Sequence, residues 1–148
     1  MDQKLRRLSN YLLSNRSAAD FNPAAVDSDA LPHLFVLEIE PVDEVLRLRI
    51  RLVGTALDEA FARPLAGRHL EEFIHGPRGA DVVEGFHNCA TTGEAIWMKQ
   101  VVRIRDRLPR FVEGVAVHLG PARIYGGLII GELPADVEEG SFESYPIY

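Results

Sequence analysis

The sequence predicts a single α+β domain, in which a strand hairpin, a helical middle and three further strands follow an N-terminal helix. Its 148 residues are 47% hydrophobic and 26% charged, which suits one globular domain with its own core. Apolar and polar residues alternate through two stretches, which favours strands. Between them apolar residues recur at three- and four-residue spacing, which favours helices.

The N-terminal helix is indicated by an apolar stripe at helical spacing, formed by Leu5, Leu8, Tyr11 and Leu12. Asn22 and Pro23 then suit the N-cap and first position of a short helix. Leu31 should end that helix, because a residue before proline avoids the α conformation. Residues 1–33 are therefore expected to form a helical cap.

Two strands, "LFVLEIE" and "LRLRIRL", come next and are joined by a short turn-like link, so a hairpin is expected. Antiparallel pairing with matched faces sets Glu38 opposite Arg49 and Glu40 opposite Arg47. The arginines could instead form a nucleic-acid surface. The solvated, charge-paired face is preferred, since the net charge of −6 disfavours binding to a polyanion.

Three helical pieces are expected in the middle of the chain. Thr55 and Asp58 resemble a capping box that opens the first. The second carries a short stripe of Leu70, Phe73 and Ile74. The third opens at Pro77 and ends at Gly93, and its apolar side holds Val82, Val83, Phe86 and Ala90.

The C-terminal half returns to strand periodicity over residues 94–105, 110–120 and 122–133. These strands complete a core that spans residues 34–133. The remaining residues, 134–148, are acidic and have no clear period, so a loosely packed tail is expected.

Strand alternation suggests an inner pocket. If Arg103 and Arg105 face outward, Met98 and Gln100 face the helices, and Gln100 then needs a polar partner there. Taking Glu132 as an outward residue adds Tyr125 to this face. A water or a backbone carbonyl is one partner for Gln100, and a small ligand is the other. The pocket candidates are Met98, Gln100, Tyr125, Phe86 and His87.

The same strand alternation gives the sheet an outer face that is too apolar to be left exposed to water. The N-terminal helix is the expected cover, from its own chain or from a partner's. This predicted cap or dimer face comprises Leu5, Leu8, Tyr11, Leu12, Trp97, Leu128 and Ile130.

No pattern indicates catalysis or a metal site. The sequence has no Gly-x-Ser-x-Gly elbow and no phosphate-binding Gly-rich loop, and its histidines lack metal-ligand spacing. Glu71 and Glu72 read as a solvated charge pair. The single cysteine, Cys89, fits a reducing compartment. No apolar run approaches the roughly 20 residues that cross a bilayer, and no signal peptide is evident, so a cytoplasmic protein is expected.

Four motifs occur in order, namely "FNPAAV", "LPHLFVLEIE", "LRIRLVGTALDEAF" and "LAGRHLEEF". Together they resemble a PAS-like family common in alphaproteobacteria, whose members carry a similar Phe-Asp-Pro, Leu-Pro, Arg-Leu-Val-Gly-Thr and Leu-Thr-Gly. Asn22 stands here for the aspartate and Ala66 for the threonine. The resemblance spans residues 20–133 and implies a five-stranded antiparallel sheet with short helices on one face.

The resemblance also bears on function. PAS domains bind haem, flavin, small carboxylates or nothing, and they signal through dimer partners. A haem would take His87 from the long helix, and the flavin-photosensing branch shares only Asn88 and Cys89 with this chain. We therefore expect no cofactor, and a non-catalytic, homodimeric sensor or regulatory domain that acts on a separate output protein, with a small ligand as an option. A haem or flavin sensor is the alternative, followed by a small α+β enzyme.

Overall fold

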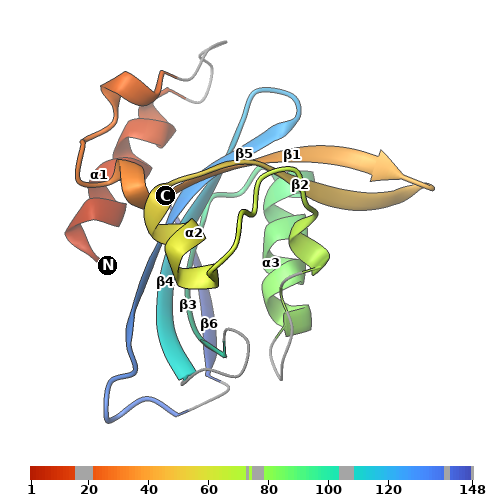
Figure 1. Ribbon diagram of the computed structural model, residues 1–148. Coiled ribbons are helices and arrows are strands. Elements are labelled where there is room, and N and C mark those ends of the chain that lie inside the picture. The colour runs from red at the N-terminus through yellow and green to blue at the C-terminus, as the bar shows by residue number, and fades with distance from the viewer. Residues whose placement is uncertain (16–21, 73, 75–78, 104–108, 139–140, 148) are drawn as a thin grey trace.

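The computed structural model describes residues 1–15, 22–72, 74, 79–103, 109–138 and 141–147. Its centre is an antiparallel sheet of six strands in the order β2-β1-β5-β4-β3-β6 (Figure 1). The strands are β1 (Leu34–Val42), β2 (Val45–Val53), β3 (Ile96–Arg103), β4 (Pro109–Leu119), β5 (Arg123–Glu132) and β6 (Phe142–Pro146). The α+β class is confirmed, with one strand more than the five expected.

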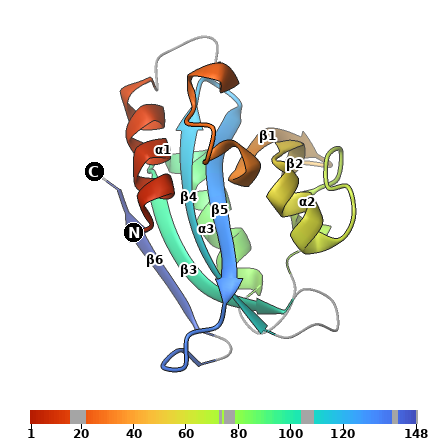
Figure 2. The ribbon, with the colours of Figure 1, turned by 60° about the vertical axis from the view of Figure 1, so that its left-hand side comes forward.

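Helices cover both faces of the sheet. The α-helices are α1 (Gln3–Ser14), α2 (Thr55–Phe61) and α3 (Gly79–Thr92), and the 3₁₀ turns are η1 (Pro23–Ala25), η2 (Leu31–His33) and η3 (Leu70–Glu72). One core cluster joins α2 and α3 to the inner face, and a second joins α1 to the outer face (Figures 1 and 2). In the described part of the chain, no helix has the length and apolar character to span a membrane.

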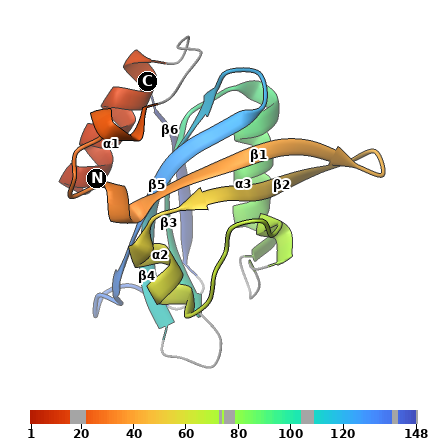
Figure 3. The ribbon, with the colours of Figure 1, turned by 45° about the horizontal axis from the view of Figure 1, so that its top comes forward.

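The β1–β2 hairpin has the predicted register, with Glu38 opposite Arg49 and Glu40 opposite Arg47. The ion pairs themselves run along the diagonals. Arg49 Nη2 lies 2.9 Å from Glu40 Oε1, and Arg51 Nη1 lies 2.7 Å from Glu38 Oε1. The side chains of both pairs are partly exposed to solvent. The tip of the hairpin extends beyond the rest of the sheet (Figure 3).

The predicted capping box at the start of α2 needs correction. Gly54, not Thr55, is the N-cap of α2, and no side chain caps that end. Asp58 Oδ1 instead accepts a hydrogen bond from Leu65 N at 3.2 Å, across the turn that follows α2.

The end of α3 is as predicted, because Gly93 has φ +75° and its N–H donates to Cys89 O at 3.1 Å. The proposed opening of α3 at Pro77 and the apolar residue Phe73 lie outside the described residues.

The C-terminal segment is not a loose tail, and this expectation was wrong. Residues Phe142–Pro146 form β6, which pairs antiparallel with β3 from Gln100 to Ile96. Flanking hydrogen bonds run from Val101 N to Ser141 O and from Ile147 N to Ala95 O, at 3.1 and 2.8 Å. A short, mostly exposed edge strand gains its stability from the backbone ladder, so it needs no regular apolar alternation.

The outer face is covered by α1 of the same chain. Leu5, Leu8 and Leu12 are buried against β4 and β5. Asp2 begins the helix, since its carboxylate accepts from Lys4 N at 2.8 Å. Close packing depends on Gly127 of β5, where a Cβ would lie 2.7 Å from Leu8 Cδ2. The predicted cover is therefore present within a single chain.

Candidate ligand-binding cavity

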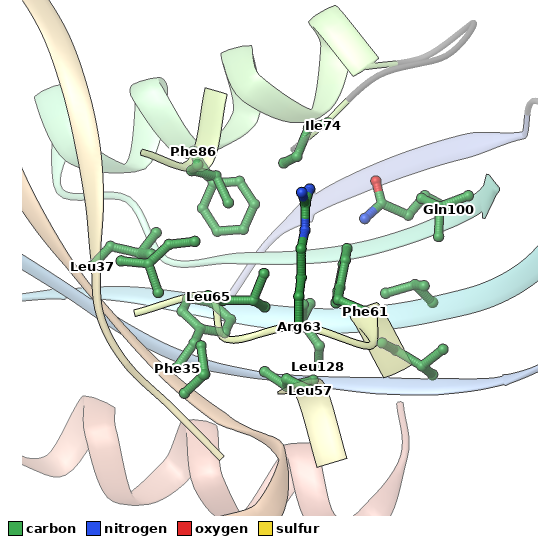
Figure 4. A pocket seen from close by; sticks show the side chains of 16 residues that line it. Phe35, Leu37, Leu57, Phe61, Arg63, Leu65, Ile74, Phe86, Gln100 and Leu128 are labelled. Carbon is green, nitrogen blue, oxygen red and sulfur yellow. The ribbon is translucent and has the colours of Figure 1, made fainter. Parts of the chain in front are cut away.

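A cavity of about 220 Å³ lies between the inner face of the sheet and the helical layer (Figure 4). Its walls come from β1, β2, β3, β4 and β5, from α2 and α3, and from the segment that joins α2 to η3. Phe35, Leu57, Phe86 and Leu128 are among the side chains that point into it. Sheet and helices together thus build a largely apolar cavity.

Only Arg63 and Gln100 are polar among the described residues that line the cavity. They come from opposite walls, Gln100 from β3 and Arg63 from the segment after α2. Figure 4 shows their side chains projecting into the cavity, with the amide of Gln100 turned toward the guanidinium of Arg63. The polar groups are therefore gathered at one end of an otherwise apolar space.

Gln100 is 7% exposed, and its Oε1 has no hydrogen-bond partner among the described residues. The backbone around it is well paired, since β3 forms ladders with both β4 and β6. A buried amide oxygen without a partner costs about 1–3 kcal/mol. The strand thus fixes the position of an amide oxygen that no described residue satisfies.

Local structure explains why Arg63 points inward. The preceding residue, Ala62, takes the left-handed conformation (φ +55°) and ends α2. Two residues later the chain is anchored again by the hydrogen bond from Leu65 N to Asp58. Arg63 is carried on this fixed turn, and its Nε is buried.

One edge of the helical layer is held by Glu71. Its Oε1 accepts from Leu48 N and lies 2.9 Å from His87 Nε2, so η3 is joined to both β2 and α3. The Glu71 side chain is 10% exposed, against 55% for Glu72. The expected solvated pair was therefore wrong for Glu71, which is a structural anchor beside the cavity.

The predicted pocket residues divide into three groups. Phe86 and Gln100 line the cavity. Met98 is buried in the inner core and His87 is engaged by Glu71, and neither is among the lining residues. Tyr125 lies on the opposite face, in the cluster with α1, and its hydroxyl accepts from Arg123 Nη1 at 3.3 Å.

The face assignment of β5 was wrong by one residue. Leu128 and Ile130 line the cavity and do not belong to the outer face. Glu132 shares their side of the strand, since residues two apart point the same way, but it lies at the strand end and is exposed. Taking the exposed Glu132 as a marker of the outer face therefore assigned the residues of β5 to the wrong faces.

Trp97 was assigned correctly to the outer face, where it packs against the α1 cluster. Its Nε1 donates to Glu113 Oε2 at 2.6 Å, and its ring lies 5.3 Å from that of Tyr145 on β6. Tyr11 packs against the same cluster.

Arg63 was missed in the sequence because it falls in a turn, where no periodicity assigns a direction to a side chain. The available signal was a lone arginine between Phe61 and Leu65 in an apolar context. Within the described ranges, no group of three or more His, Cys, Asp or Glu side chains is placed to hold a metal ion.

Comparison of the chain with protein-family models, with curated proteins and with solved structures gives no match.

Proposed function

We propose that this chain is a non-catalytic, PAS-like sensor domain that binds a small ligand in the inner cavity and acts by associating with other protein chains. The observation that carries the proposal is Gln100, whose buried amide oxygen has no hydrogen-bond partner among the described residues and which lines a largely apolar cavity. Convergent polar groups in a well-formed apolar cavity are the usual mark of a small-molecule site. The PAS-like assignment rests on the four sequence motifs and on an element order in which two strands are followed by helices and then by β3, β4 and β5, with β6 as an additional strand.

The chemistry of the cavity favours binding over catalysis. An amide does not titrate, and a guanidinium keeps its proton throughout the physiological range. General acid–base catalysis needs a group whose pKa lies near the working pH. Arg63 and Gln100 are suited to hold and orient a ligand.

The geometry does not favour haem or flavin. His87 is engaged by Glu71 and does not line the cavity. Cys89 is fully buried in the inner core and is not among the lining residues. The cavity volume of about 220 Å³ also lies below the roughly 300–1,000 Å³ typical of sites for drug-sized ligands, which suits a smaller molecule.

The proposed partner is a second copy of the chain, in the cytoplasm. Because α1 already covers β4 and β5, contact is proposed beside it, where Tyr145 is 43% exposed next to Trp97 and Lys99. Rigid aromatic side chains of this kind are enriched at protein interfaces. Light scattering at tens of micromolar should give the mass of a dimer, and a mass equal to one chain would reject this part of the proposal.

The ligand proposal is tested by native mass spectrometry of freshly purified protein, with the substitution Ile130→Phe used to fill the cavity. Its matched control is Ile129→Phe, because the neighbouring side chain lies on the other face of the same strand, against the α1 cluster. Wild type and the control should carry a small-molecule adduct that Ile130→Phe loses. Equal adducts on all three chains, or no binding of any added apolar probe, would reject the cavity as the site.

A further inference from the structure

We infer that the ligand of this cavity is an amphipathic organic acid, with an apolar body, one carboxylate and a hydrogen-bond donor next to that carboxylate. This inference rests on the proposed function, since it names the class of molecule that the same cavity would hold.

The apolar body follows from the walls. Aliphatic and aromatic side chains from the sheet, α2 and α3 surround most of the space. A polar body would lose its hydration there without gaining partners, which is costly. A short aliphatic chain or a small ring has only apolar surface to remove from water, so its burial in the cavity is favourable.

The carboxylate follows from Arg63. Its guanidinium is planar, carries five N–H donors and matches the two oxygens of a carboxylate. Figure 4 shows it at the end of the cavity where Gln100 also lies. A charge-assisted hydrogen bond is roughly twice as strong as a neutral one, so this side chain should favour an anionic head over an alcohol.

The adjacent donor follows from Gln100. The unpartnered atom is Oε1, an acceptor, and it is 7% exposed as part of a residue fixed in a doubly paired strand. At neutral pH a carboxylate is ionised and has no hydrogen to donate to this oxygen. A hydroxyl or N–H beside the carboxylate would satisfy Oε1 while Arg63 binds the charge, as in a 2-hydroxy acid.

The test is calorimetric titration of wild-type protein at neutral pH with octanol, octanoate and 2-hydroxyoctanoate. Octanoate should bind roughly tenfold more tightly than octanol, and 2-hydroxyoctanoate several-fold more tightly again. Arg63→Met should remove the preference for octanoate over octanol. Gln100→Leu should remove only the preference for the hydroxylated acid. Arg47→Met, which removes a charge from the solvated face of the hairpin, is the matched control and should change neither preference.

The outcomes separate the two proposals. Octanol binding as tightly as both acids, with Arg63→Met without effect, would overturn the acid class while leaving the cavity as a ligand site. An equal affinity for octanoate and 2-hydroxyoctanoate would overturn the role given to Gln100. Failure of all three probes to bind would overturn this inference together with the proposed function.

Discussion

Gly54 lies directly against Pro32. A Cβ added at Gly54 would overlap the carbonyl carbon and oxygen of Pro32 and the carbonyl oxygen of Leu31. Gly54 N also donates to Leu34 O at 2.7 Å. The junction between β2 and α2 therefore packs against the turn that precedes β1, so two of the four resembling motifs are in contact in the structure.

This contact predicts that Gly54→Ala will be strongly destabilising. The new methyl would meet backbone, which cannot move away as a flexible side chain can. The free energy of unfolding should fall by at least about 2 kcal/mol, measured by denaturant titration. Gly131→Ala is the control, because a Cβ there meets no atom within 4 Å and its φ is compatible with alanine. Equal losses in the two variants would contradict the packing described.

Helix α1 should belong to the same cooperative unit as the sheet. Leu8 is 2% exposed and packs against Gly127. Leu8→Ala should lower the free energy of unfolding by about 2–5 kcal/mol, as for other buried leucines. Asn10→Ala, on the exposed side of the helix, should have little effect. An undiminished stability of Leu8→Ala would mean that α1 is not docked in solution.

Glu71 should anchor η3 through its hydrogen bonds to Leu48 N and His87. Glu71→Ala leaves a backbone donor without its partner and should cost about 1–3 kcal/mol, measured by thermal or denaturant unfolding. The neighbouring Glu72→Ala serves as the control, since that side chain is 55% exposed. A larger loss in the control would show that η3 is not held in this way.

The hairpin cluster should make stability depend on acid. The Arg49 guanidinium first, and then His69, lower the pKa of Glu40 from its ordinary value of 4.5. The Glu40 carboxylate therefore contributes stability above about pH 4.5 that is lost as the pH falls through its lower folded-state pKa. Arg49 also donates to Gly67 O at 2.8 Å, which ties the segment after α2 to the hairpin.

Between neutral pH and pH 3, Glu40→Gln should lose less free energy of unfolding than wild type does, measured by urea titration at each pH. Glu44→Gln, at the exposed hairpin turn, is the control and should follow the wild-type curve. Parallel curves for wild type and Glu40→Gln would contradict a role of this carboxylate in acid unfolding.

The sequence predicted where the helices and strands lie better than it predicted which face of the sheet each side chain occupies. In β1 and β2 one side is solvated, so charge alternation revealed both phase and register. In β5 the run "YGGLIIG" is covered by α1 on one side and by the cavity wall on the other, and a strand that is apolar on both faces shows no alternation. Tyr125, Leu128 and Ile130 were misplaced for that reason.

The candidate site was predicted only in part, for a related reason. Gln100 stood out because it is polar within an alternating apolar strand. Arg63 did not, because the direction of a side chain in a turn depends on tertiary contacts such as the hydrogen bond between Leu65 and Asp58. β6 was missed because its pairing depends on the backbone edge of β3, which leaves little trace in composition.

The central claim is that Gln100 is held in the cavity for a ligand at the expense of stability. The most direct test is thermal unfolding of wild type and Gln100→Leu, each with and without 2-hydroxyoctanoate. Without ligand, Gln100→Leu should be more stable by about 1 kcal/mol, because it removes an unsatisfied buried oxygen, and ligand should raise its melting temperature less than that of wild type. A less stable Gln100→Leu whose melting temperature rises with ligand as much as that of wild type would contradict the claim.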